Sequence, residues 1–298
     1  MSLRAIYATD SAKGWQPWGA FVPFLGIAFV AMTVASLTAA LQHIRLVDAS
    51  ENPVGLLGFA AFLLLPFAAL GLVVFTWVSI VERRPLATIG LIGSHRTRTF
   101  LLGHLTGVAM VTAIVAGIWA AGCLTAGAVG PAFRSPAGLS GIAILLACFA
   151  VQSSVEEILF RGWMLSAIAT KFGVIIAVVV SSLAFTLMHF DPATSRLFVV
   201  NVFLFAVFAC YWSITTGNIW GVMGWHAGWN WLMATGFELR VTGLDAHMPA
   251  LIVKLVPRGP DYLTGGTQGP EGSIMCSLVL TGTIIFLFCA QDGEADAR

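Results

Sequence analysis

The chain has 298 residues, of which 58% are hydrophobic and only 10% are charged, and its formal net charge is +1. Soluble domains carry about 25% charged residues, so this composition leaves no room for a sizeable soluble domain and predicts a single integral membrane domain over residues 1–298. The near-neutral charge argues against a nucleic-acid partner and leaves the lipid bilayer as the expected surroundings. The five cysteines show neither a disulfide framework nor a zinc-finger spacing.

Apolar runs predict an all-α, polytopic fold of about eight transmembrane helices with a polar site inside the bundle. In chain order, the expected helices cover residues 20–41, 54–81, 100–121, 139–170, 174–190, 197–214, 219–236 and 273–290. Each run has about 17 residues or more, which is the length that a helix needs to cross the hydrocarbon core. The polar motifs described below place the motif-bearing core of the domain at about residues 139–236.

The most basic loop follows the second apolar run and covers residues 82–98. It contains Arg83, Arg84, Arg96 and Arg98. Arginines beside membrane spans favour the cytoplasmic face, so we expect this loop in the cytoplasm. With eight helices, both termini then lie in the cytoplasm as well, and we expect the protein in a bacterial cytoplasmic (inner) membrane.

Three charges interrupt the fourth apolar run in the stretch VEEILFRG, residues 155–162. A charged side chain near the bilayer centre costs about 2.5 kcal/mol or more, so it is kept where it is paired or functional. Glu157 and Arg161 are four residues apart, share one face of a helix and can neutralise each other. Glu156 is turned about 140° away from Arg161, so it needs a partner from another helix.

Two later apolar runs carry polar residues that align with this stretch in depth. His189 lies about as far after the turn near residue 172 as Glu156 lies before it, so an antiparallel hairpin brings the two side by side. His226 and Asn230 are four residues apart on one face of the seventh run, which begins on the same side as that turn. Because buried polar groups are costly, we interpret these four side chains as one shared polar site.

This set of side chains is suited to the hydrolysis of an amide bond. A carboxylate beside a histidine can hold and deprotonate a water, and a histidine with an asparagine can donate hydrogen bonds to a developing oxyanion. Glu156, His189 and His226 also form a two-histidine, one-carboxylate set of the kind that holds a divalent metal such as zinc, although the chain has no HExxH helix. Proton-coupled transport also uses buried Glu and His, but it would not need Asn230.

Three short motifs follow one another along these helices. EEILFR at 156–161 matches the pattern EExxxR, FTLMH at 185–189 matches FxxxH, and HAGWN at 226–230 matches HxxxN. In this order they resemble the CPBP (Abi) family of intramembrane proteases, which includes the type II CAAX prenyl endopeptidases and bacteriocin-processing relatives. The resemblance covers about residues 155–235, and the flanking helices match only in hydropathy.

The resemblance implies a CAAX-protease-like (CPBP) intramembrane peptidase that hydrolyses a peptide bond of a membrane-associated peptide or protein. Glu156 together with His189 would activate the attacking water. His226 and Asn230 would form the oxyanion site.

The resemblance also implies supporting residues around the site. Glu157 and Arg161 would hold the helices in register, and Phe185 would pack one turn before His189 on the same face. The family is described both as metal-dependent and as using glutamate without a metal in the chemical step. A metalloprotease, with a divalent ion such as zinc on the three ligands named above, and a metal-free enzyme therefore both stay open.

Two other functions compete with the protease. One is a catalytically silent membrane scaffold or bacteriocin-immunity-type protein that keeps the polar site for its structure. The other is a small-solute or proton-coupled transporter, which the lack of an internal repeat and of paired broken helices disfavours.

Small and aromatic residues of the seventh run have simpler interpretations. Gly224 and Gly228 form a GxxxG pattern, which predicts close contact with another helix rather than substrate binding. Trp225, Trp229 and Trp231 are expected to pack against neighbours or to anchor the helix at the membrane interface.

Overall fold

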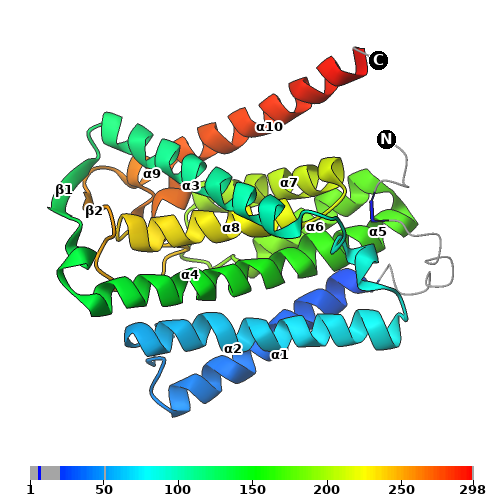
Figure 1. Cartoon of the computed structure of the whole chain (residues 1–298), viewed down its shortest axis with the longest axis horizontal. Coiled ribbons are helices and arrows are strands. Elements are labelled where there is room, and N and C mark those ends of the chain that lie inside the picture. Colours follow the sequence, from blue (N-terminus) through cyan, green and yellow to red (C-terminus); the bar gives the residue numbers. More distant parts are fainter. Residues whose placement is uncertain (1–5, 8–20, 50–51, 297–298) are drawn as a thin grey trace.

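The computed structural model describes residues 6–7, 21–49 and 52–296, and of residues 290–296 it describes only the backbone. The chain forms a bundle of roughly aligned helices with a short pair of strands at one end (Figure 1). The α-helices are α1 (Val22–His43), α2 (Gly55–Thr76), α3 (Arg96–Ala120), α4 (Pro136–Glu157), α5 (Leu165–Phe172), α6 (Val174–Met188), α7 (Arg196–Thr216), α8 (Trp220–Trp231), α9 (Asp261–Thr264) and α10 (Ile274–Asp296). Short 3₁₀ turns cover Leu86–Ile89, Pro131–Arg134, Gly266–Gln268 and Pro270–Gly272.

The eight predicted apolar runs all contain a helix, but the predicted number of about eight membrane spans is not confirmed. Within the described residues, five helical stretches are long and apolar enough to cross a membrane. They are Val22–His43, Gly55–Val81, Arg96–Ala120, Pro136–Phe172 and Arg196–Thr216. The remaining runs fall short because α6 ends at Met188, α8 has 12 residues, and the apolar part of α10 stops at Cys289.

Three of these runs change to π-helix before they end. The π-helical segments are Trp77–Val81, Ile158–Met164 and Leu232–Gly236. The second of them connects α4 to α5 without a break, so the fourth run is one rod, as expected, but it is not a regular α-helix. Single π-helical turns within α-helices are rare and frequently mark functional sites, and this one begins directly after Glu157.

A small sheet corrects the all-α prediction. Strand β1 (Leu124–Val129) pairs antiparallel with β2 (Val253–Pro257), with Thr125 opposite Val256. The first strand lies between α3 and α4 and the second in the long loop of residues 237–272, so the sequence gives no local sign of the pairing. The two strands and α9 cluster at one end of the bundle, whereas α5 lies at the other end (Figure 1).

Helices α4 and α8 run through the middle of the molecule. Helix α4 packs against α2 on one side and against α8 on the other, and α8 packs most extensively against α3 (Figure 1). Glu156 and Glu157 on α4 and His226 and Asn230 on α8 therefore belong to the most enclosed helices of the bundle.

The contact between α3 and α8 depends on glycines from both helices. A Cβ added to Gly224 would lie 1.9 Å from the carbonyl oxygen of Phe100, and one added to Gly228 would lie 2.2 Å from that of His104. On the opposite helix, a Cβ added to Gly103 would lie 2.0 Å from a backbone oxygen of α8. These distances are too short for any side chain, so the close contact predicted from the GxxxG pattern is confirmed.

Replacing Gly224 by alanine should separate α3 from α8. We expect Gly224→Ala to lower the free energy of unfolding by about 1–3 kcal/mol, which is the usual cost of overpacking a tight interior. The measurement is thermal unfolding of the purified protein in detergent. The matched control is Gly282→Ala on α10, where an added Cβ meets no atom within 4 Å. Equal melting temperatures for the two variants would contradict the interpretation.

Candidate functional site

The site is built around the buried ion pair between Glu157, the last residue of α4, and Arg161 in the π-helical turn. Nη1 of Arg161 lies 3.1 Å from Oε1 of Glu157, and neither side chain is exposed. The guanidinium group also lies over the ring of Phe185 on α6, 4.3 Å from its centroid. The pairing predicted from the four-residue spacing is confirmed, and the arginine also connects α4 to α6.

His226 on α8 contacts the same carboxylate, which the sequence did not lead us to expect. Its Nδ1 lies 2.8 Å from Oε1 of Glu157. A carboxylate only accepts hydrogen bonds, so we assign the proton to Nδ1. The Nε2 atom of the ring is then turned toward Glu156, 3.6 Å from its Oε2.

The carboxylate of Glu156 differs from that of its neighbour. Both residues are buried, and Oε2 of each has no hydrogen-bond partner among the described residues, but Oε1 of Glu157 binds Arg161 and His226. The expected partner from another helix is His226, at a distance slightly beyond a direct hydrogen bond. The carboxylate of Glu156 is therefore near His226 but is not held by it in a direct hydrogen bond.

His189 follows the last residue of α6 and caps its C-terminal end instead of lying within the helix. Its Nδ1 lies 2.9 Å from the carbonyl oxygen of Phe185, so this nitrogen donates the hydrogen bond. The two rings pack together with centroids 4.4 Å apart, as the FxxxH spacing implies. The half-buried histidine thus has a fixed ring and a free Nε2 atom that can act as a base.

Asn230 lies one turn after His226 and contacts α4. Its Nδ2 donates to Oε1 of Gln152 at 3.2 Å and to Oγ of Ser153 at 3.4 Å. Sequence analysis missed Gln152, although a signal was present, because a glutamine four residues before Glu156 lies on the same face of an otherwise apolar helix.

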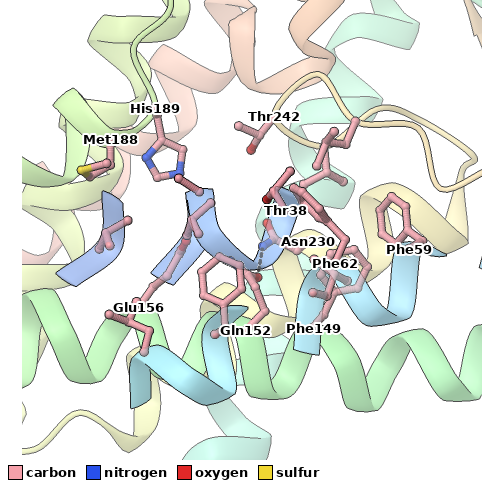
Figure 2. A pocket seen from close by; sticks show the side chains of 18 of the residues that line it. Thr38, Phe59, Phe62, Phe149, Gln152, Glu156, Met188, His189, Asn230 and Thr242 are labelled. Carbon is pink, nitrogen blue, oxygen red and sulfur yellow. Dashed lines mark hydrogen bonds between the residues drawn. The ribbon is translucent and has the colours of Figure 1, made fainter. Parts of the chain in front are cut away.

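These residues line two adjoining cavities, and Figure 2 shows the larger one. The larger cavity has a volume of about 460 Å³ and the smaller one about 40 Å³. Glu156, His189 and Asn230 line both of them, and His226 lines the smaller one. The structure therefore brings the four predicted side chains together.

The larger cavity has a polar side and an apolar side. The polar side chains are Glu156, His189 and Asn230, with Gln152, Thr242 and Thr38 of α1 (Figure 2). Its other walls come from α1, α2 and α4 and are formed by Val30, Val34, Phe59, Phe62, Leu63 and Phe149, among others. The loop of residues 237–272 contributes Val241, Thr242 and Leu244, so the cavity adjoins the end of the bundle opposite the Arg-rich loop.

A second carboxyl group at the smaller cavity, that of Glu271, was not predicted. Its Oε1 accepts a hydrogen bond from Nε1 of Trp229 at 3.0 Å, and its Oε2 accepts from the backbone nitrogen of Thr242 at 2.5 Å and from Oγ1 at 3.1 Å. Burial raises the pKa of this carboxyl above its usual range. The hydrogen bonds and the nearby His189 lower the pKa, but their effect is smaller than that of burial. The residue lies in a loop rich in glycine and proline, where no periodic pattern points to it.

The expected metal ligands do not form a coordination site. Within the described residues, no three His, Cys, Asp or Glu side chains are placed to share one ion. The ring orientations are not the reason, because each histidine holds its Nδ1 on Glu157 or on a backbone carbonyl and leaves Nε2 as the atom that could bind an ion. The donors of Glu156, His189 and His226 are not placed for the tetrahedral shell that catalytic zinc requires.

Comparison with known proteins agrees with the motifs. Residues 138–232 match the family model described as type II CAAX prenyl endopeptidase Rce1-like. This segment contains the three motifs, and the match confirms the resemblance to the CPBP family. A search of curated proteins finds no match. Together with the apolar helices, the family match points to an integral membrane protein.

The two adjacent glutamates should differ in their effect on stability. Glu157→Gln leaves Arg161 buried without an anion, so we expect the free energy of unfolding to fall by about 3 kcal/mol or more. Glu156→Gln removes a carboxylate that holds no direct hydrogen bond, so the change should stay within about 1 kcal/mol. Thermal unfolding of both variants in detergent measures the difference, and a more damaging Glu156→Gln would contradict the geometry.

Proposed function

We propose that the protein is an intramembrane endopeptidase that hydrolyses a peptide bond of a membrane-associated peptide or protein. The observation that carries the proposal is the buried carboxylate of Glu156. It has no direct hydrogen bond within the described part of the chain, and it faces a cavity that His189 and Asn230 also line. A buried acceptor left open in this way is suited to hold the water that attacks the substrate.

In the first step, Glu156 and His189 hold this water and remove its proton. The Nε2 atom of His189 can accept a hydrogen bond from this water, because the ring proton is on Nδ1, which is bonded to the backbone. The water oxygen attacks the carbonyl carbon of the scissile bond, and the proton passes to the carboxylate. A positioned acid or base of this kind contributes about 10²–10⁴-fold to the rate.

In the second step, His226 and Asn230 stabilise the negative charge on the carbonyl oxygen. Glu157 holds Nδ1 of His226, so Nε2 faces the site and donates to the oxyanion when the ring carries both protons. Asn230 donates to the oxyanion through the N–H that it would release from Ser153, the longer of its two hydrogen bonds at 3.4 Å. The C–N bond then breaks, and the proton held by Glu156 moves to the leaving amine.

The apolar walls of the large cavity support a substrate from the membrane. Aromatic side chains of α2 and α4 face the site across the cavity, where Phe59, Phe62 and Phe149 lie together (Figure 2). They would contact apolar side chains of a peptide and exclude water from the reacting bond. We place the protein in a bacterial cytoplasmic membrane with both termini in the cytoplasm, following the Arg-rich loop; residues 1–5 and 297–298 lie outside the described part.

A catalytically silent scaffold is the second candidate. The observation that favours it is the buried cluster of Glu157, Arg161 and His226, joined through Oε1 of Glu157, which a protein without activity would also keep for stability. In that case a glutamine at position 156, which has the same shape, would serve as well as Glu156.

Replacing Glu156 by glutamine separates the two candidates. The experiment is comparative N-terminal proteomics of membranes from cells that express the wild type, Glu156→Gln, Glu238→Gln or no protein. We expect defined new N-termini with the wild type and a loss of about 100-fold or more in Glu156→Gln, because glutamine cannot take a proton from water. The control residue Glu238 lies in the loop and pairs with Lys254, so Glu238→Gln should match the wild type.

The outcomes of that experiment are distinct. New termini in the wild type and in Glu238→Gln, but not in Glu156→Gln, support the protease. Equal effects of the wild type and Glu156→Gln, with a difference only when the protein is absent, would reject it in favour of the scaffold.

The oxyanion role of Asn230 predicts a selective loss of rate. On a substrate peptide identified in that experiment, Asn230→Ala should lower kcat by about 10²–10³-fold, as the removal of one oxyanion donor does in other hydrolases. KM should change little, because the donor acts on charge that develops after binding. Steady-state kinetics of the purified protein in detergent provide the measurement, and an unchanged kcat would contradict this role.

A further inference from the structure

The carboxylate of Glu271 connects the catalytic helix α8 with the loop of residues 237–272. On one side it accepts the indole N–H of Trp229, which directly precedes Asn230 in the chain. On the other side it accepts two hydrogen bonds from Thr242, one from the backbone and one from the hydroxyl. These three donors occupy both oxygens, so the group is suited to hold neighbouring residues in place and not to react.

The turn that carries Glu271 is itself fixed from a third element. Asn201 on α7 donates through Nδ2 to the carbonyl oxygen of Glu271 at 2.7 Å and to that of Ser273 at 2.9 Å. Its Oδ1 accepts from Oγ of Ser277 on α10 at 2.6 Å. Because α7 and α10 hold the backbone at this point, the carboxylate has a defined position from which to hold the loop.

The backbone conformation of Thr242 indicates that the hydrogen bonds to Glu271 keep this part of the loop in place. Its φ angle is +51°, in the left-handed region that a β-branched residue rarely adopts. Such a conformation persists when the surrounding contacts determine it, and here both donors of Thr242 end on one carboxylate. The same residue lines both cavities beside Glu156 and His189, so the contacts that hold its backbone also fix part of the cavity wall.

We propose that Glu271 is a positioning residue that fixes the loop wall of the cavity, formed by Val241, Thr242 and Leu244, relative to Asn230. The inference rests on the proposed function, because the wall matters through the substrate that it would contact. Displacements of about 1 Å in a wall that positions a substrate can cost 10²-fold in rate. Glu271 would therefore influence which peptides are cut, without touching the reacting bond.

The first test follows the loop itself and needs no substrate. Hydrogen–deuterium exchange with mass spectrometry on the purified full-length protein in detergent compares the wild type, Glu271→Gln, Thr242→Ser and Glu238→Gln. In Glu271→Gln we expect exchange of the amides in residues 240–244 to become about tenfold faster or more, because glutamine has one acceptor oxygen for donors that occupy two in the wild type. Thr242→Ser keeps both donors and should match the wild type, as should Glu238→Gln. Protection of strand β2 serves as the internal standard for folding.

The second test asks whether the hold matters for cleavage. The N-terminal proteomics experiment is repeated with Glu271→Gln at equal protein level, and the relative yields of the individual new termini are compared with those of the wild type. We expect a changed ratio between cleavage sites, of about threefold or more for some of them, whereas a uniform loss would indicate a fold defect. Glu238→Gln, at a residue that lines neither cavity, should keep the wild-type ratios.

Each outcome decides the proposal. Faster exchange at 240–244 together with a changed ratio of sites supports it. If exchange at 240–244 is unchanged, Glu271 does not hold the loop and the proposal is wrong. If exchange is faster but the ratios of cleavage sites match the wild type, Glu271 stabilises the loop only and its positioning role is wrong. If the wild type yields no new termini at all, the proposed function fails and the role in cleavage fails with it, whereas the exchange data still establish or refute the hold on the loop.

Discussion

The site depends on one oxygen atom, Oε1 of Glu157, which binds Arg161 and His226 at the same time. Buried charges in an apolar bundle are costly unless they are paired, so α4, its π-helical turn and α8 must meet at this point. Arg161 extends the cluster to α6 by covering the ring of Phe185. Three helices thus take their mutual position from a single carboxylate, and this position turns Nε2 of His226 toward Glu156.

What the sequence predicts well is what depends on helical spacing and on the cost of burial. The pairing of Glu157 with Arg161, the common depth of the other polar residues and the contact made by Gly224 all follow from residues on one helix or on successive ones. What it does not predict depends on the path of the long loop. Glu271 and the pairing of β1 with β2 arise from residues more than a hundred positions apart or from turns without a periodic pattern.

The predicted number of membrane spans is not confirmed, and two short helices show why apolar runs alone do not determine it. An apolar run shows that a segment is buried, but helix length is set by where the backbone turns and by which neighbours cover it. Helix α8 lies between α3 and α4, so its residues Gly221–Asn230 are buried by protein and need no contact with lipid. Helix α6 ends at Met188, which leaves His189 to cap it with its ring in the site. The shortness of these two helices is therefore part of how the polar residues reach the cavity.

The carboxyl groups of the bundle show where chemistry can occur. Glu82 accepts hydrogen bonds from two tryptophans and an arginine, Glu157 binds an arginine and a histidine, and Glu271 accepts three donors. Each of these groups is committed to neighbouring side chains, and any reaction at them would first have to break those contacts. Glu156 is buried at the same cost but is left, within the described residues, without a direct hydrogen bond. In the same part of the chain, Oε2 of Glu157 also lacks a partner, but its Oε1 is committed to Arg161 and His226, so among these four carboxylates Glu156 is the one that stays available beside the cavity for a water or a substrate.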